Sequence, residues 1–146
     1  MSQFSRVFPA RLSAFESLTG LVDQFSVVAG LQRNHALKLR LVLEELFINS
    51  IRHGYGGDCD APIWVTLEQQ LDCVRVTYED AAPAYDPLAA PRYGDLALPV
   101  EQRPIGGLGV LLTVTLSRDI EYRYAQGRNC IRLHLACGDA DSASAG

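Results

Sequence analysis

Three polar side chains with complementary chemistry recur at helical spacing in the first half of the chain. Glu45, Asn49 and His53 are four residues apart, so on a helix advancing about 100° per residue they share one face. An asparagine oxygen can ligate Mg²⁺, and a glutamate can orient or deprotonate a nucleophile. The glycines that follow, including Gly54 and Gly56, let a backbone come close to a ligand. This face could form one wall of a ligand site, but a solvated polar stripe gives the same pattern.

A second candidate is the carboxylate of Asp80, which ends a stretch of alternating apolar and polar residues and precedes Ala81, Ala82 and Pro83. A carboxylate at a strand end, followed by small residues, could face an exocyclic amine of a ligand while the backbone stays close. An acidic turn would have the same composition, so the pattern alone leaves both interpretations open.

The third candidate is a glycine cluster at the start of an apolar helical pattern. Gly106, Gly107 and Gly109 lie within four residues, on either side of Leu108. The exposed N–H groups and the dipole of a helix start favour a phosphate group there. A tight turn is the simpler alternative for such a cluster.

Hydrophobic periodicity predicts the elements that must position these groups. Leu39, Leu43, Leu46 and Phe47 are expected to pack on a core, on a helix that Asn34 would cap. Gly30 is expected to close the preceding helix. The predicted order is a strand (Gln3 to Phe8), two helices (Leu12 to Ala29, and Asn34 to about His53), a hairpin (Ile63 to Glu68 and Cys73 to Tyr78), a long loop (Glu79 to Gly107), a helix (Gly106 to Leu116) and a hairpin (Arg118 to Tyr124 and Asn129 to Leu135).

This order favours an α+β fold, in which strands pair mostly with their sequence neighbours. The expected architecture is a two-layer α/β sandwich, with a mostly antiparallel sheet and helices on one face. Residues 1–137 are predicted to form a single domain, and residues 138–146, rich in Ala, Ser, Asp and Gly, a disordered tail.

Composition narrows the class of protein. The 146 residues are 48% hydrophobic with a formal charge of -4, which is typical of one globular domain. The absence of a basic block argues against direct nucleic-acid binding, and no apolar run reaches membrane-spanning length. No signal peptide is evident, so a cytoplasmic location is expected. Reduced thiols are expected for the four cysteines, with a disulfide or zinc site as the alternative.

Taken together, the three motifs are more specific than any one of them. They read Glu45-x-x-x-Asn49-x-x-x-His53-Gly54, then Asp80-Ala-Ala-Pro-Ala-Tyr-Asp-Pro87 after a strand, then Gly-Gly-Leu-Gly109. This arrangement resembles the nucleotide site of the GHKL ATPase superfamily. Within this superfamily, the length of the chain and the spacing of its motifs are most similar to those of the anti-sigma-factor serine/threonine-protein kinases of the RsbW type. The resemblance covers roughly Phe4 to Leu135 and implies a Bergerat-type ATP-binding fold, with ATP and Mg²⁺ as cofactors.

The resemblance also implies roles for individual residues. Asn49 would hold the Mg²⁺ that bridges the ATP phosphates, and Glu45 would be the general base that activates a serine hydroxyl. Asp80 would accept a hydrogen bond from the adenine amino group. His53 would line the edge of the pocket, with a structural role as plausible as a catalytic one.

The glycine cluster would bind the ATP phosphates. Gly106, Gly107 and Gly109, with Leu108 between them, would give a lid over the nucleotide its hinge and place helix N–H groups on the phosphates. One position departs from the family pattern, because Ala82 stands where the family usually has glycine. The added methyl group is expected to weaken nucleotide binding or to shift the base.

Two functions follow from the resemblance. The first is an anti-sigma regulatory factor with ATP-dependent serine/threonine protein kinase activity. It would bind a sigma factor and phosphorylate a STAS-type antagonist in a partner-switching system, and it would act as a homodimer. The alternative is a nucleotide-responsive protein-binding module with little or no kinase activity. Glu45 favours the kinase, since a pure binder needs no base, and Ala82 favours the module.

Overall fold

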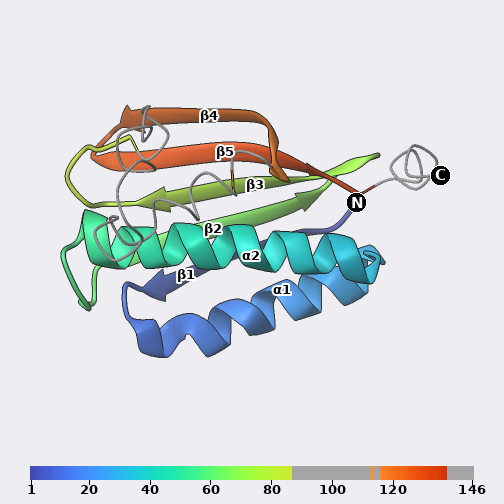
Figure 1. The fold of residues 1–146 in the computed structure, drawn as a ribbon, viewed down its shortest axis with the longest axis horizontal. Helices are drawn as coiled ribbons and strands as arrows, with labels where there is room; N and C mark the ends of the chain where they lie inside the picture. Colours follow the sequence, from blue (N-terminus) through green and yellow to red (C-terminus); the bar gives the residue numbers. More distant parts are fainter. Residues whose placement is uncertain (87–112, 114–115, 138–146) are drawn as a thin grey trace, which may run out of the picture.

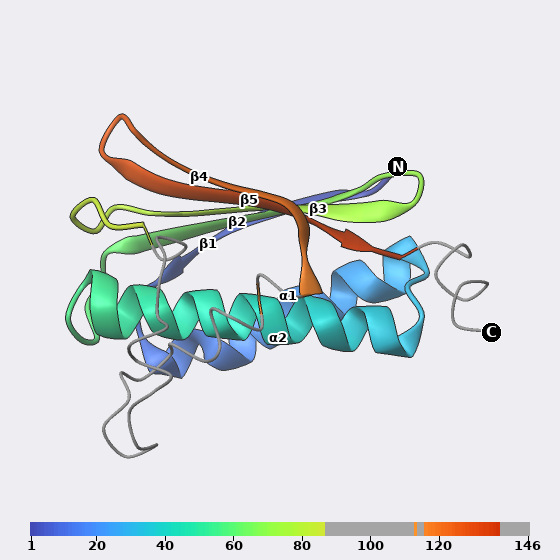
Figure 2. The ribbon, with the colours of Figure 1, turned by 45° about the horizontal axis from the view of Figure 1, so that its top comes forward.

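The structure is a computed structural model that describes residues 1–86, 113 and 116–137. In this part of the chain, two helices cover one face of an antiparallel sheet. The strands follow the spatial order β1-β2-β3-β5-β4 (Figure 1). The α+β two-layer sandwich expected from the sequence is therefore confirmed, with both layers visible in Figure 2. The elements are β1 (Gln3–Pro9), a 3-10 turn (Leu12–Ala14), α1 (Phe15–Ala29), α2 (Arg33–Asn49), a π-helical turn (Ser50–Gly54), β2 (Pro62–Gln69), β3 (Cys73–Asp80), β4 (Arg118–Ala125) and β5 (Arg128–Ala136).

The sheet forms because its strands alternate between buried and less buried residues. Alternate residues of β2, β3 and β5 are buried, which is the pattern of strands with one face on a core. In β3 the buried series includes Val74, Val76 and Tyr78 and ends at Asp80. The period of two thus places a carboxylate on the buried face of the sheet, at the end of a central strand.

The helices supply the other half of the core. Their buried residues recur at intervals of three and four, so each helix presents one apolar stripe to the sheet. The side chain of Phe47 lies edge-on to Phe8 and Phe15, with ring centroids 6.2 Å and 5.4 Å apart. The four core residues predicted for α2 are all buried: Leu39, Leu43, Leu46 and Phe47.

The ends of the helices show one correct and one wrong prediction. Gly30 closes α1 with a left-handed backbone (φ +68°), as expected for a C-terminal glycine. The prediction that Asn34 caps α2 was wrong, because the cap is Gln32 and it makes no side-chain cap hydrogen bond. The extended backbone of Gln32 starts the helix two residues earlier and leaves Asn34 inside the first turn.

The C-terminal hairpin turns at the two residues that the sequence indicated. Gln126 and Gly127 both have positive φ angles, +56° and +76°, as a two-residue type I′ turn requires. This turn fixes the register of β4 against β5, and the pairing of β5 with β3 places Asn129 directly beside Asp80. Of the helix predicted from Gly106 to Leu116, the structure describes only Thr113 and Leu116, both helical. The predicted tail, residues 138–146, lies outside the described residues.

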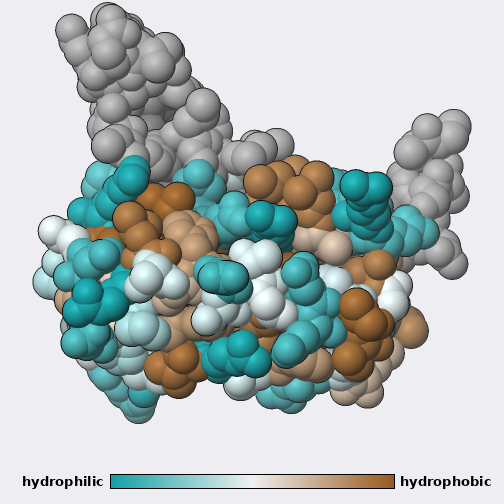
Figure 3. Space-filling view, turned by 90° about the horizontal axis from the view of Figure 1, so that it is seen from below, coloured by the Kyte–Doolittle hydropathy of each residue, from teal (hydrophilic) through white to brown (hydrophobic). Residues whose placement is uncertain are grey.

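The surface mixes hydrophilic and hydrophobic groups, as Figure 3 shows for one face of the molecule. Within the described ranges, neither helix combines the length and the apolar character needed to span a membrane. The four cysteines, all in described positions, carry free thiols. Phe4, Phe8 and Phe25 pack in or against the protein's own core. The apolar residues of the N-terminal segment therefore serve first to hold the two layers together.

Replacement of Phe47 by alanine should destabilise the fold by about 3–5 kcal/mol, because a fully buried ring is lost from the contact between α2 and the sheet. Urea denaturation of the Phe47→Ala protein measures this loss. Val27→Ala, at an α1 position that is 81% exposed, is the control and should change stability by less than about 0.5 kcal/mol. Equal effects of the two substitutions would contradict the placement of the core.

Candidate functional site

The buried carboxylate of Asp80, which is 2% exposed, is the centre of the candidate site. Its Oδ2 accepts a hydrogen bond from Ser50 Oγ (2.7 Å). Its Oδ1 accepts one from the Ala82 N–H (3.1 Å) and one from Asn129 Nδ2 (2.9 Å). A carboxylate has about four acceptor positions, so these donors leave room for about one more. Asp80 is therefore held by three segments of the chain and can still accept a hydrogen bond from a ligand.

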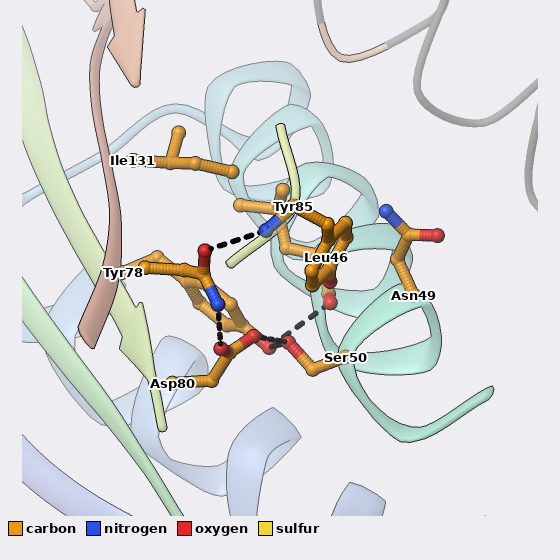
Figure 4. Close-up of a pocket in the computed structure, with 8 residues that line it drawn as sticks. Leu46, Asn49, Ser50, Tyr78, Asp80, Tyr85 and Ile131 are labelled. Carbon is orange, nitrogen blue, oxygen red and sulfur yellow. Dashed lines mark hydrogen bonds between the residues drawn. The ribbon is translucent and has the colours of Figure 1, made fainter. Parts of the chain in front are cut away.

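Ser50 links this carboxylate to the end of α2. Its hydroxyl also lies 2.7 Å from the Tyr78 hydroxyl, which donates to the Leu46 carbonyl oxygen (2.9 Å). Tyr78 is fully buried, and burial raises its pKa well above the ordinary value, so the phenol stays protonated as a donor. The two hydroxyl protons are shared over three close contacts, which run from Asp80 through Ser50 and Tyr78 to Leu46 (Figure 4). They fix the end of β3 against α2.

The π-helical turn after α2 changes which residue faces the site. A π turn stacks a residue above the fifth residue before it, whereas an α turn uses the fourth. Gly54, five residues after Asn49, consequently lies against the loop after β3, where an added methyl group would approach Ala82 Cβ to 3.1 Å. His53, which the α-helical spacing placed on the face of Glu45 and Asn49, is exposed on this turn. A role for His53 at the pocket edge stays a prediction.

Asn129, at the start of β5, ties the loop after β3 to Asp80. Its amide nitrogen donates to Asp80 and also to the carbonyl oxygens of Ala82 (3.1 Å) and Pro83 (3.2 Å). Its amide oxygen accepts from the Tyr85 N–H (3.1 Å) and from the Tyr122 hydroxyl. Both ends of this buried amide are thus used, and the side chain sets the course of the chain from Ala82 to Tyr85.

Tyr55 fixes the same loop from the other side. Its hydroxyl donates to the Pro62 carbonyl oxygen (2.7 Å) and accepts from the Ala81 N–H (2.7 Å). Burial is the main cause that raises the pKa of Tyr55, which keeps this hydroxyl a donor at neutral pH. The backbone next to Asp80 is therefore held on both sides.

Asn49 is the last residue of α2, and Glu45 lies about one turn before it. Asn49 is buried, with 5% of its surface exposed, and lines the same pocket as Asp80. No described group donates a hydrogen bond to the buried Glu45 Oε2. Burial, followed by the neighbouring Glu44, raises the pKa of Glu45, while Arg52 opposes the rise. A carboxylate with a raised pKa and an unused oxygen has the properties of a general base.

Ala82, which stands where the resemblance expects glycine, is 1% exposed. Its methyl group lies close to Gly54 at the end of the π-helical turn. The methyl group thus fills space between the loop and the helix, and its effect on nucleotide affinity stays a prediction. Gly106, Gly107, Leu108 and Gly109 lie outside the described residues, so their predicted phosphate contacts are likewise untested.

Sequence reasoning missed Ser50, Tyr78 and Asn129. Tyr78 could have been found, because it lies two residues before Asp80 and a strand places both on one face. Ser50 could also have been found, because it lies four residues after Leu46 and three after Phe47, on the buried face of the helix. Asn129 carries no local signal, since its position depends on the pairing of β3 with β5.

The space beside Asp80 is small. A cavity of about 10 Å³, room for about one water molecule, remains there. Figure 4 shows the side chains around it, which belong to Leu46, Asn49, Ser50, Tyr78, Asp80, Tyr85, Asn129 and Ile131. One acceptor position on Asp80 suits an exocyclic amine, and the amide of Asn49 suits a hard cation. The residues present therefore fit an adenine nucleotide with Mg²⁺, although the base needs more room than this cavity offers.

Comparison with known proteins identifies the family of this chain. The family model of the histidine kinase-like ATPase domain matches residues 8–135. The chain is 28% identical over 114 residues to the serine-protein kinase RsbW of Listeria monocytogenes, which covers 76% of this chain and 70% of that protein. It is 27% identical over 117 residues to the serine-protein kinase RsbW of Listeria innocua, with the same coverage.

A solved structure shows the same fold. The crystal structure of the RsbU and RsbW domains of Rv1364c from Mycobacterium tuberculosis matches with a TM-score of 0.66 at 14% identity, over 94% of this chain. The chain spans about a third (33%) of that longer protein. The family match covers most of the sequence, and the chain therefore belongs to the histidine kinase-like ATPase domain family.

Removal of the Ser50 hydroxyl should destabilise the protein by about 1–3 kcal/mol, because Asp80 loses a donor and remains buried. Chemical denaturation of Ser50→Ala tests this, with the exposed Ser17→Ala on α1 as the matched control. Ser50→Ala should also weaken the hold on the loop after β3 and so raise amide exchange at residues 81–86. Unchanged stability and exchange would show that Asp80 does not depend on Ser50.

Proposed function

We propose that this protein is an ATP-dependent serine/threonine protein kinase that also acts as an anti-sigma factor, with a STAS-type antagonist as its substrate. The observation that carries the proposal is the buried Asp80, which lines one pocket with Asn49, a helical turn from Glu45, as the resemblance to the GHKL nucleotide site expects. The similarity to two serine-protein kinases supports the kinase class. A sigma factor as binding partner, a homodimer and a cytoplasmic location are part of the same proposal.

In this mechanism Asp80 accepts a hydrogen bond from the adenine amino group, at the position that its three donors leave open. Asn49 supplies an oxygen to the Mg²⁺ ion. Among the described residues, no group of three or more His, Cys, Asp or Glu side chains could hold a metal ion. Mg²⁺ usually binds through one or two protein groups together with substrate phosphates, so Asn49 would hold it only with the nucleotide. The ion neutralises phosphate charge when it is bound.

Glu45 would act on the protein substrate. Its carboxylate would accept the proton of a serine hydroxyl, and its raised pKa brings it closer to the pH at which a base works best. Glu44, the preceding residue, forms an ion pair with Arg40 through Oε1 (2.8 Å). Of the two neighbouring carboxylates, Glu45 is the one that shares a helix face with Asn49, four residues further on.

The second candidate function is a nucleotide-responsive protein-binding module with little or no kinase activity. The small cavity beside Asp80 favours it, because a site that admits a nucleotide base only after rearrangement couples nucleotide binding to a conformational change. Phosphate transfer to a partner protein separates the two candidates.

Asn49→Ala should remove the Mg²⁺ dependence of ATP binding, because the amide that contacts the metal is lost. Calorimetric titration of ATP with and without Mg²⁺ measures this. Asn34→Ala, at an exposed position in the first turn of α2, is the control and should bind as the wild type does. If Asn49→Ala keeps its Mg²⁺-dependent affinity, Asn49 does not hold the metal.

Glu45→Gln should lower phosphate transfer by about 10²–10⁴-fold and leave partner binding intact. The matched control is Glu44→Gln, which should keep its transfer rate. Because the pKa of Glu45 is raised in the folded state, its ionisation lowers stability as the pH rises from the ordinary pKa through the raised one. Glu45→Gln should therefore be more stable than the wild type above that range, with little difference below it. Full phosphate transfer by Glu45→Gln would exclude Glu45 as the base.

A further inference from the structure

Tyr85 occupies the space beside Asp80 that a base would need. A methyl group built on Gly54 would lie 3.1 Å from Tyr85 Cε1 and 3.3 Å from the Tyr85 hydroxyl, so the ring lies against the end of the π-helical turn. Tyr85 lines the same cavity as Asp80 and Asn49 (Figure 4). Burial raises the pKa of Tyr85, and a hydrogen bond with Ser50 opposes that rise. The phenol thus reaches the residue that also holds Asp80.

With the ring in place, the pocket is too small for a nucleotide base. Sites for small-molecule ligands typically have volumes of about 300–1,000 Å³. The cavity that remains measures about 10 Å³, which is room for about one water molecule. A base therefore cannot reach the open acceptor position of Asp80 while the ring of Tyr85 stays where it is.

Contacts with β5 and with the end of α2 help to hold Tyr85 in this position. Its backbone N–H donates to Asn129 Oδ1 (3.1 Å), and its ring contacts the end of α2 through Ser50 and Gly54. The amide nitrogen of Asn129 binds Asp80, so one side chain fixes both the adenine-facing carboxylate and the tyrosine that covers it.

The loop can release Tyr85 without opening the core. Ala81, Pro83 and Ala84 are exposed, so most of the residues between Asp80 and Tyr85 lie at the surface. Only Ala82 is buried among them, where its methyl group lies close to Gly54. Movement of Tyr85 consequently needs the loss of its own contacts and no rearrangement of the sheet.

We propose that Tyr85 determines nucleotide affinity because its ring occupies the position of the nucleotide base, and that the ring must leave the pocket before a nucleotide can bind. This inference rests on the proposed nucleotide site and adds a step to it. The apparent dissociation constant then equals the intrinsic one divided by the fraction of molecules in which Tyr85 has left. The observed rate constant for association should reach a plateau at high nucleotide concentration, because opening of the pocket then becomes the rate-limiting step.

The test uses the full chain with Mg²⁺ and a fluorescent N-methylanthraniloyl derivative of ADP. Equilibrium titration and stopped-flow association are measured for the wild type, Tyr85→Ala and Tyr85→Phe. Tyr124→Ala is the matched control, because this tyrosine is 46% exposed on β4 and lies away from the cavity. Urea denaturation of each variant shows that it is folded, and Tyr85→Phe, which keeps the ring, serves if Tyr85→Ala is unstable.

Tyr85→Ala should bind at least about 5-fold more tightly than the wild type, with an association rate that rises linearly with concentration. Tyr85→Phe should lie between the two, and Tyr124→Ala should match the wild type. Binding by Tyr85→Ala where the wild type shows none would also support the proposal. If the wild type binds and Tyr85→Ala binds equally or more weakly, Tyr85 is a wall of the site and the proposal is wrong, while the nucleotide site stands. If no variant binds, the nucleotide site itself is wrong and the proposal falls with it.

Discussion

The burial of the Asp80 carboxylate is the constraint on which the rest of the site depends. A buried carboxylate without partners is costly, so each of its donors must be supplied by the fold. Ser50 comes from the π-helical turn, Asn129 from the start of β5, and the Ala82 N–H from the loop that follows β3. Pairing of β3 with β5 and packing of α2 on the sheet must both be correct before these donors meet. The sandwich therefore positions one acceptor group with little freedom of movement.

The same contacts explain how the site could respond to a ligand. Asn129 holds Asp80 with its amide nitrogen and the loop residue Tyr85 with its amide oxygen. Two of the three donors to the carboxylate, Ser50 and Asn129, lie outside the loop, at the end of α2 and at the start of β5. A rigid acceptor beside a movable ring differs from a site that is open at all times, because nucleotide binding must compete with the protein's own side chain.

The sequence was sufficient to predict the layers, because period-two strands and apolar stripes on the helices identify their buried faces. It also indicated Asp80, Asn49 and Glu45, through their types and spacing. It could not show the π turn, which replaces His53 by Gly54 opposite the loop after β3. It could not show Asn129 either, because that contact arises from strand pairing across 49 residues of sequence. Local patterns specify elements, whereas the partners of a buried carboxylate depend on how distant elements meet.

The most direct test of the central claim, that Asp80 recognises an adenine base, is a calorimetric comparison of ATP and GTP binding by the wild type and by Asp80→Asn. Adenine presents an amino group where guanine presents a carbonyl oxygen. A carboxylate accepts from the first and repels the second, whereas an asparagine amide can donate to guanine. We expect the wild type to prefer ATP and Asp80→Asn to lose that preference. Equal binding of ATP and GTP by the wild type, or an unchanged preference for ATP in Asp80→Asn, would contradict the role of Asp80.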